Sequence, residues 1–90
     1  MRIEFDPAKS ARNAEKHGLA LDRFADLDLD AAMIERDTRR DYGEDRYVMI
    51  APLGGRLHVA CFCIRNGAFR VISLRKANSR EVKIYERVAT

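Results

Sequence analysis

The sequence has 90 residues, of which 47% are hydrophobic and 34% are charged, and it carries a formal net charge of +3. This length allows one domain with a modest core and excludes a second domain. The mild positive charge does not by itself indicate a nucleic-acid partner, but 13 of the 17 cations are arginine, whose planar fork suits phosphate recognition.

The N-terminal segment lacks the apolar core of a secretion signal, and no apolar run approaches the length that spans a membrane. Cys61 and Cys63 lie two positions apart in one expected strand, so they cannot easily form an unstrained disulfide. Two free cysteines fit a reducing compartment and provide no thiolate zinc site. We therefore expect a cytoplasmic protein with no membrane association and no disulfide framework.

Local signals divide the chain into eight elements. Asp6 suits an N-cap, Pro7 suits the first helical position, and Gly18 suits a left-handed C-cap after His17. Ala20 is a poor cap for the helix that follows, so the start of that helix is less sharply defined. In chain order we expect strand 3–5, helix 7–17, helix 21–27, strand 31–37, strand 46–51, strand 56–64, strand 69–76 and helix 78–88.

Two turns and a capping box organise the second half of the chain. Pro52 to Gly55 predicts one turn, and Asn66-Gly67 is a strong signal for a two-residue hairpin. Asn78 and Glu81 have the spacing of a capping box at the start of the last helix. The order β-α-α-β-β-β-β-α predicts an α+β fold, with an antiparallel sheet of four to five strands and helices mostly on one face.

A two-residue turn at Asn66-Gly67 fixes the register that we expect between the last two strands. It places His58 directly opposite Arg75, so that both side chains share one face of the sheet. The opposite face holds a more apolar set, Val59, Cys61, Ile72 and Leu74. We therefore expect the helices to cover that second face and to leave His58, Ser73 and Arg75 at one end of a partly open face.

The segment from Arg70 to Arg87 concentrates positive charge, although Arg70 itself is expected on the core-side face. Arg75, Lys76 and Arg80 lie across the junction with the last helix, whose N-terminal N–H groups favour an anion. Metal-free RNA cleavage needs a proton acceptor for the 2′-hydroxyl, a proton donor for the 5′-oxygen, and cations around phosphorus. We expect Arg75 and Arg80 to hold the phosphate. The candidates for proton transfer are His17, His58, Glu81 and Tyr85.

Each proton-transfer candidate also has a purely structural interpretation. His17 can stabilise the C-terminal end of a helix dipole, and His58 can be a packed strand residue. Glu81 can serve only as the capping partner of Asn78, and Tyr85 can belong to the core. Two histidines without a supporting carboxylate pattern predict no metal site, and the absence of a glycine-rich phosphate loop predicts no nucleotide cofactor.

Three ordered motifs of this chain resemble the BrnT toxin family (DUF497). The segment IEFDPAKSARNAEKHG followed by LALDRFADL is similar to the family's opening, and DYGEDRYVMIAPLGGRLHVACF is similar to its central strand and hairpin. The segment RVISLRKANSREVKIYER is similar to its C-terminal motif. The sequence departs from the family pattern at Phe5, where tryptophan is more usual, and at Ala20, where a capping serine is common.

The resemblance implies a RelE-like ribonuclease fold and a toxin of a type II toxin–antitoxin system that cuts RNA and blocks translation. It implies a BrnA antitoxin with a ribbon-helix-helix region, in a complex of two toxins and two antitoxins that contacts operator DNA only through the antitoxin. The site candidates carried over by motif are Lys16, His17, Arg46, Arg75, Lys76, Arg80, Glu81 and Tyr85. We expect RNA contacts from Lys16, Arg46, Lys76, Lys83 and Arg87.

Two other classes of function remain open at this point. A non-catalytic module that binds RNA or the ribosome would use the same basic surface, so the sequence does not separate it from a nuclease. A DNA-binding regulator is disfavoured because the chain lacks a helix-turn-helix or basic-ribbon arrangement. Arg80, Lys83 and Arg87 share one face of the last helix, and its outer part, Lys83 and Arg87, is expected to guide RNA or to meet an acidic antitoxin surface rather than to perform chemistry.

Overall fold

The computed structural model describes residues 1–89 and confirms the α+β fold. Its strands are β1 (Ile3–Glu4), β2 (Met33–Arg36), β3 (Arg46–Leu53), β4 (Arg56–Arg65) and β5 (Ala68–Lys76). Its helices are α1 (Pro7–His17), the 3₁₀ helices η1 (Leu21–Asp26) and η2 (Leu29–Ala31), and α2 (Ser79–Ala89). No helix in this part of the chain is long and apolar enough to cross a membrane.

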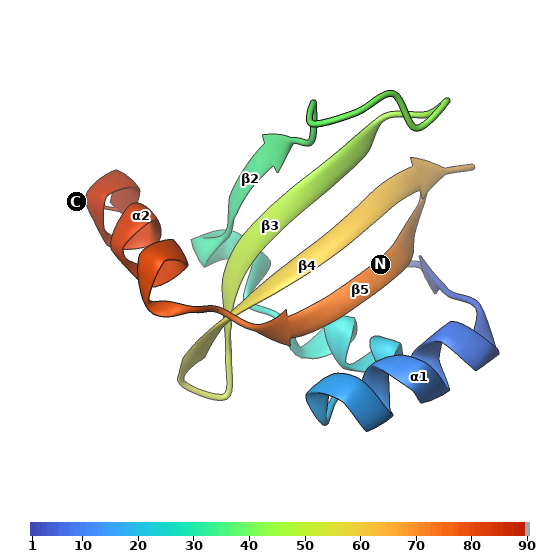
Figure 1. Ribbon diagram of the computed structural model, residues 1–90, viewed down its shortest axis with the longest axis horizontal. Helices are drawn as coiled ribbons and strands as arrows, with labels where there is room; N and C mark the ends of the chain where they lie inside the picture. The colour runs from blue at the N-terminus through green and yellow to red at the C-terminus, as the bar shows by residue number, and fades with distance from the viewer. Residues whose placement is uncertain (90) are drawn as a thin grey trace.

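The five strands form one sheet in the order β1-β5-β4-β3-β2 (Figure 1). The expectation of a purely antiparallel sheet was wrong, because β1 pairs in parallel with β5, with Ile3 opposite Phe69. The long connection from β1 through α1 to the later strands allows this pairing, since parallel neighbours need a crossover rather than a hairpin. The turn between β3 and β4 is also shorter than expected, because β3 continues through Pro52 to Leu53.

The predicted helix caps are present at α1. The Asp6 side chain accepts a hydrogen bond from the Ala8 N–H at 2.9 Å, and Gly18 adopts the left-handed conformation with φ of 75°. Ala20 provides no side-chain cap for η1, and the Ser10 hydroxyl of α1 accepts the Leu21 N–H instead, at 2.9 Å. A serine on one helix therefore caps the next one, which explains why the local sequence signal for η1 is weak.

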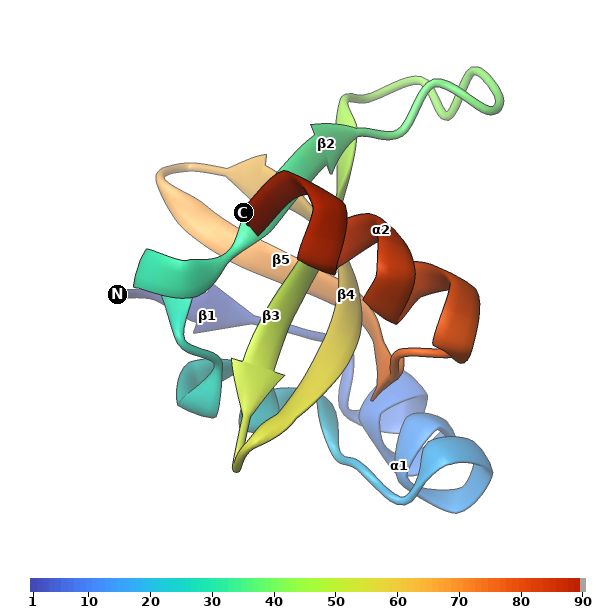
Figure 2. The same cartoon turned by 90° about the vertical axis from the view of Figure 1, so that its left-hand side faces the viewer.

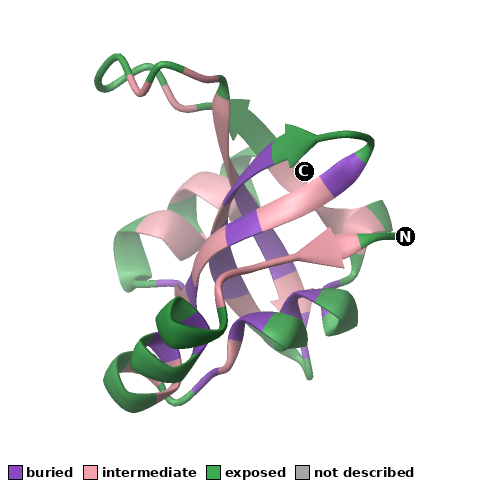
Figure 3. Cartoon of the chain, turned by 90° about the vertical axis from the view of Figure 1, so that its right-hand side faces the viewer, coloured by how far each residue is buried: buried purple, intermediate pink, exposed green. Residues whose placement is uncertain are grey.

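Helices lie on both faces of the sheet. The first core packs beneath α1 and η1, and Figures 1 and 2 show α1 on the opposite side of the sheet from α2. Figure 3 shows the buried residues gathered along the strands, while the helices turn exposed residues outward. The first core comprises Leu19, Leu21, Phe24, Leu27, Met49, Ala51, Leu53, Ala60, Phe62, Val71 and Leu74. The second, smaller core comprises Ile50, Val59 and Ala77, against which Val82 and Tyr85 of α2 pack.

A bulge in β5 overturns part of the expected register. From the hairpin as far as Phe62 the pairing follows the expectation, but the register then shifts by one residue, leaving Ile72 without a partner. The shift turns Leu74 onto the face of Phe62 and places His58 opposite Lys76, so the expected pairing of His58 with Arg75 was wrong. It also makes the face of Phe62 the larger core, which reverses our assignment of the two faces.

Asn13 fastens α1 to the sheet from a buried position. Its Nδ2 donates to the carbonyl oxygens of Leu19 and Leu74, both at 2.7 Å, and its Oδ1 accepts the Leu74 N–H at 3.3 Å. These bonds satisfy buried backbone groups of Leu19 and Leu74. They hold α1 against the face of the sheet that carries the larger core.

Candidate functional site

The face of the sheet that α2 covers only in part carries a group of arginines. Arg46 on β3, Cys63 on β4 and Arg70 on β5 are register partners, so their side chains share this face. Arg75 lies on the same face because it pairs with Val59, which is four residues before Cys63 on β4. Together with neighbouring residues these arginines form what we call the arginine face, whose members are Arg39, Arg46, Arg65, Arg70 and Arg75.

Arg75 is held rigidly at the junction between β5 and α2. Its Nη1 and Nη2 donate to the two carboxylate oxygens of Glu81, each at 2.8 Å. Glu81 also accepts the Asn78 N–H at 2.9 Å, and the Asn78 side chain accepts the Glu81 N–H at the same distance. The predicted capping box and the inward orientation of Glu81 are therefore confirmed, and one carboxylate both caps α2 and orients Arg75.

Both partners in this pair are charged. The hydrogen bonds from Arg75 are the main reason that the pKa of Glu81 lies below its usual value. Partial burial of the carboxyl group opposes this lowering, and the hydrogen bond from the Asn78 N–H adds to it. The Glu81 carboxylate raises the pKa of Arg75. The Arg75 side chain is 38% exposed and that of Glu81 only 20%, so the guanidinium remains accessible while the carboxylate lies behind it. The arrangement suits Arg75 for binding an anion from the solvent side.

The lowered pKa of Glu81 predicts an acid-dependent loss of stability. The contribution of Glu81 to the free energy of unfolding should be complete above about pH 4.3, the ordinary pKa of glutamate. It should disappear as the pH falls through the lower pKa that Glu81 has in the folded protein. We expect Glu81→Gln to cost about 1–2 kcal/mol near neutral pH and progressively less towards about pH 3. Urea unfolding across this range measures the effect, and Glu15→Gln, on the exposed side of α1, is the control. A difference that stays constant with pH would contradict the role assigned to Glu81.

The loop of residues 37–45 is also ordered around an ion pair. Asp37 accepts hydrogen bonds from Arg39 Nε at 2.9 Å, from Arg39 Nη2 at 2.8 Å and from the Tyr42 hydroxyl at 2.9 Å. The Arg39 bonds are the main reason that the pKa of Asp37 lies far below its usual range. The Arg46 guanidinium stacks 4.3 Å from the centre of the Tyr42 ring. A polar segment that the sequence marks only as a loop is thus a fixed part of the arginine face.

Arg39 acts electrostatically on the centre of this face. Glu81 is the main reason that the pKa of Arg75 is raised, and Asp37 is the main reason that the pKa of Arg39 is raised. The positive charge of Arg39 opposes the rise at Arg75, and negative charge on an ionised Cys61 sulfur adds to the rise at both arginines. Cys61 pairs with Ser73 in the sheet, between the rows of Arg70 and Arg75. Figure 2 shows α2 crossing in front of the sheet and the loop projecting beside its upper end. Arg39 was not among the candidates predicted from the sequence, because no local pattern indicates that this loop lies beside β4 and near Arg75 of β5.

The two histidines lie apart from Arg75. His58 is 4% exposed at the start of β4, on the face of the larger core, and its Nδ1–H donates to the Arg56 carbonyl oxygen at 2.8 Å. His17 ends α1, on the other side of the sheet from α2. Tyr85 lies one turn after Glu81 on the inner side of α2, and its hydroxyl donates to the Ala31 carbonyl oxygen at 2.6 Å. Among the proton-transfer candidates, only Glu81 and Tyr85 are brought to the side of the sheet that carries Arg75.

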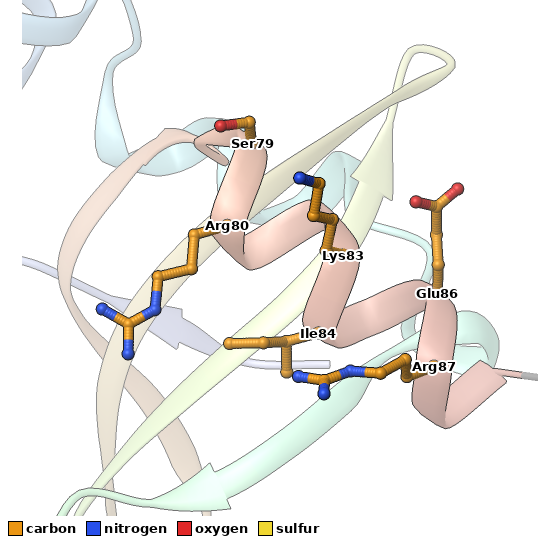
Figure 4. Close-up of a pocket in the computed structure, with 6 residues that line it drawn as sticks. All are labelled: Ser79, Arg80, Lys83, Ile84, Glu86 and Arg87. Carbon is orange, nitrogen blue, oxygen red and sulfur yellow. The ribbon is translucent and has the colours of Figure 1, made fainter.

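The outer side of α2 forms a separate basic surface. Arg80, Lys83 and Arg87 lie together here, as the helical spacing predicts, and line an open hollow with Ser79, Ile84 and Glu86 (Figure 4). Figure 4 shows the side chains of Arg80, Ile84 and Arg87 extending to the same side of the helix. Arg75 does not line this hollow, so Arg75 and Arg80 belong to neighbouring but different surfaces. Lys16 on α1 and Lys76 at the end of β5 are exposed elsewhere.

Guanidinium groups that carboxylates hold in place suit one ligand chemistry above others. Arg39 is fixed by Asp37 and Arg75 by Glu81, and both arginines keep exposed edges. Such pre-ordered donors bind phosphate oxygens with little further loss of side-chain entropy. Within residues 1–89, no group of three or more His, Cys, Asp or Glu side chains is placed to hold a metal ion.

A comparison with protein families gives one match. The family model described as "Ribonuclease toxin, BrnT, of type II toxin-antitoxin system" matches residues 5–81. The matched span starts just before α1 and ends in the first turn of α2, so it includes Arg75 and Glu81. A search of curated proteins found no match to the chain.

Proposed function

The chain belongs to the BrnT family of ribonuclease toxins from type II toxin–antitoxin systems, and we propose that it is an endoribonuclease that cuts RNA without a metal ion and thereby inhibits translation. The observation that carries the proposal is the position of Arg75. This guanidinium is fixed by two bonds to Glu81, remains accessible, and lies among four other arginines on one face of the sheet.

In the proposed reaction the RNA's own 2′-hydroxyl oxygen attacks the adjacent phosphorus, and the bond to the 5′-oxygen breaks. The 2′-hydroxyl proton passes to a base, and an acid returns a proton to the departing 5′-oxygen, leaving a 2′,3′-cyclic phosphate and a 5′-hydroxyl. Arg75 stabilises the negative charge that grows on the phosphate oxygens. Arg39 adds positive charge near the scissile phosphate, and Arg80 contacts the RNA strand beyond that phosphate.

Proton transfer in this proposal falls to groups on the same side of the sheet. Tyr85 is the candidate acid because it packs on the same side of the sheet as Arg75, and its hydroxyl would have to leave the Ala31 carbonyl oxygen to reach the phosphate. Glu81 is a weak base because its pKa is lowered by Arg75, so its role is to position that arginine. His58 is buried on the other face, and we give neither His58 nor His17 a contact with the reacting phosphate.

The family membership implies a protein antitoxin as partner. We propose that this is a BrnA-like ribbon-helix-helix protein that joins the toxin in a cytoplasmic complex of two toxins and two antitoxins. Operator DNA is then contacted only through the antitoxin. The outer side of α2, with Arg80, Lys83 and Arg87, is a surface that either an acidic antitoxin segment or RNA would fit.

The decisive experiment incubates the purified chain with RNA in the presence of excess EDTA. We expect cleavage products with 2′,3′-cyclic phosphate and 5′-hydroxyl ends, and we expect the purified antitoxin to suppress them. Salt-sensitive binding without any product would instead support the alternative, a non-catalytic module for RNA or the ribosome. Cleavage that EDTA abolishes and added Mg²⁺ restores would contradict the metal-independent mechanism.

A further inference from the structure

A second pocket lies at the end of the arginine face away from α2, where β5 approaches the start of α1. It surrounds the buried Cys63 and reaches the bulge at Ile72. Its charged lining comprises four cations, Lys9, Arg46, Arg65 and Arg70, and two carboxylates, Asp6 and Glu44. The excess of cations makes the pocket a site for an anion rather than for a metal or a neutral ligand.

The carboxylates in this pocket do not neutralise all of its arginines. Glu44 accepts hydrogen bonds from Arg46 Nε at 3.2 Å and from Arg65 Nη2 at 2.8 Å, so it holds these two side chains in place. Arg70 is half-buried, yet its side chain forms no hydrogen bond or ion pair with any other residue in 1–89. Arginine is rarely buried without a partner, because removing its charge from water is costly.

Cys63 does not supply the missing negative charge. Burial is the main reason that the pKa of its thiol is raised, and the nearby Glu44 carboxylate raises it further. The sulfur therefore remains a neutral thiol on the floor of the pocket. The Arg70 guanidinium is therefore left available to bind an anion from solution.

The position of the pocket relative to Arg75 indicates which ligand. The β4 partners of Arg70 and Arg75 are Cys63 and Val59, which lie four residues apart in one strand. This separation corresponds to about 13 Å along the sheet, roughly the rise of four stacked nucleotides in one strand. The two arginines lie on the same face, so one RNA strand running along β4 and β5 can reach both.

We propose that the pocket around Arg70 binds a backbone phosphate of the RNA, several nucleotides away from the phosphate that is cut at Arg75. This inference rests on the proposed function for the identity of the ligand. The pocket gives the enzyme a substrate requirement, namely a single strand long enough to extend from Arg75 to Arg70. Because the contact is to the backbone, it contributes affinity without base preference.

The test uses a 12-nucleotide RNA with 2′-O-methyl groups, which lacks the attacking hydroxyl and cannot be cut by the proposed reaction. Its affinity is measured over a range of salt concentrations for the full chain and for three variants. Arg70→Gln removes the charge but keeps most of the side-chain length, and Arg70→Lys keeps the charge without the planar fork. Arg56→Gln makes the same change at an exposed position at the start of β4, the end of that strand away from the pocket.

We expect Arg70→Gln to weaken binding roughly tenfold and to lower the salt dependence by about 0.7 in the slope of log affinity against log salt concentration. Arg70→Lys should keep that slope, and Arg56→Gln should change neither quantity. Thermal unfolding establishes that each variant is folded, and the conclusion rests on the Lys variant and the control if Arg70→Gln unfolds.

The outcomes separate this inference from the proposed function. If Arg70→Gln binds the RNA as Arg56→Gln does, the phosphate site is wrong even when the wild-type chain cuts RNA. If Arg70→Gln loses affinity for the antitoxin but not for RNA, the pocket serves the protein partner and the inference is also overturned. If the wild-type chain cuts no RNA but Arg70→Gln weakens RNA binding as expected, the phosphate site at Arg70 is supported and the nuclease proposal is wrong.

Discussion

Replacement of Arg75 with alanine is expected to lower kcat for RNA cleavage by roughly 10²–10³-fold, the loss that accompanies removal of one pre-ordered donor to a developing oxyanion. Arg75 is the arginine that Glu81 fixes with two hydrogen bonds while leaving it accessible. The effect should appear mainly in kcat, because the charge that Arg75 stabilises grows in the transition state. Single-turnover cleavage of a short RNA measures it, and growth arrest on expression provides the readout in cells.

Arg80→Ala is the matched comparison for this prediction. Arg80 is exposed on the outer side of α2 and belongs to a different surface, so its loss should affect KM and salt dependence more than kcat. Arg75→Lys should recover little activity, since an ammonium cannot make the two-bond contact with Glu81. A folded Arg75→Ala and Arg80→Ala double variant that still arrests growth would refute the assignment of both residues.

Phe24 in η1 should be the most sensitive position for stability. Its side chain is completely buried. The centre of its ring lies 5.7 Å from the ring centre of Phe62 and 5.2 Å from the ring centre of Phe69. We expect Phe24→Ala to lower the free energy of unfolding by about 3–5 kcal/mol, because it removes the ring and leaves a cavity. A domain of 90 residues has roughly 5–13 kcal/mol in total. Urea unfolding followed by circular dichroism measures the change.

Phe24→Leu provides the control for the cavity. It retains most of the buried apolar volume, and we expect it to cost markedly less than Phe24→Ala, by a margin of about 2 kcal/mol. Phe5→Ala, at a position that is only half-buried, should fall between wild type and Phe24→Ala. Similar small losses for all three variants would mean that η1 is not an essential part of the core.

Local signals along the chain predicted the helices well. The caps at Asp6 and Gly18 act through hydrogen bonds to groups within a few residues, so the sequence suffices to place them. The same is true of the capping box between Asn78 and Glu81. The start of η1 was harder to predict, because its cap comes from Ser10 on another helix. Contacts between distant segments leave no such local signal.

The single extra residue in β5 shows how tertiary structure decides the site. In an unbroken ladder Arg70 and Arg75 point to opposite faces, because successive side chains alternate. The bulge at Ile72 adds one residue, so both arginines come to the same face and His58 falls on the other. Nothing in the residues around Ile72 marks this shift, since the register follows from packing Leu74 into the larger core.

The sequence by itself determined the α+β class, the helix caps, the hairpins, the family and the capping box between Asn78 and Glu81. These features depend on local hydrogen bonds, on turn chemistry or on ordered motifs, all of which involve residues that are close together in the sequence. Only the tertiary structure decided which side chains share a face: Arg39 lies near enough to Arg75 to affect its pKa, Arg70 faces the same side as Arg75, and His58 faces the other side. The physical reason is that strand register and loop position are set by long-range packing, and a one-residue shift reverses the face on which a side chain lies.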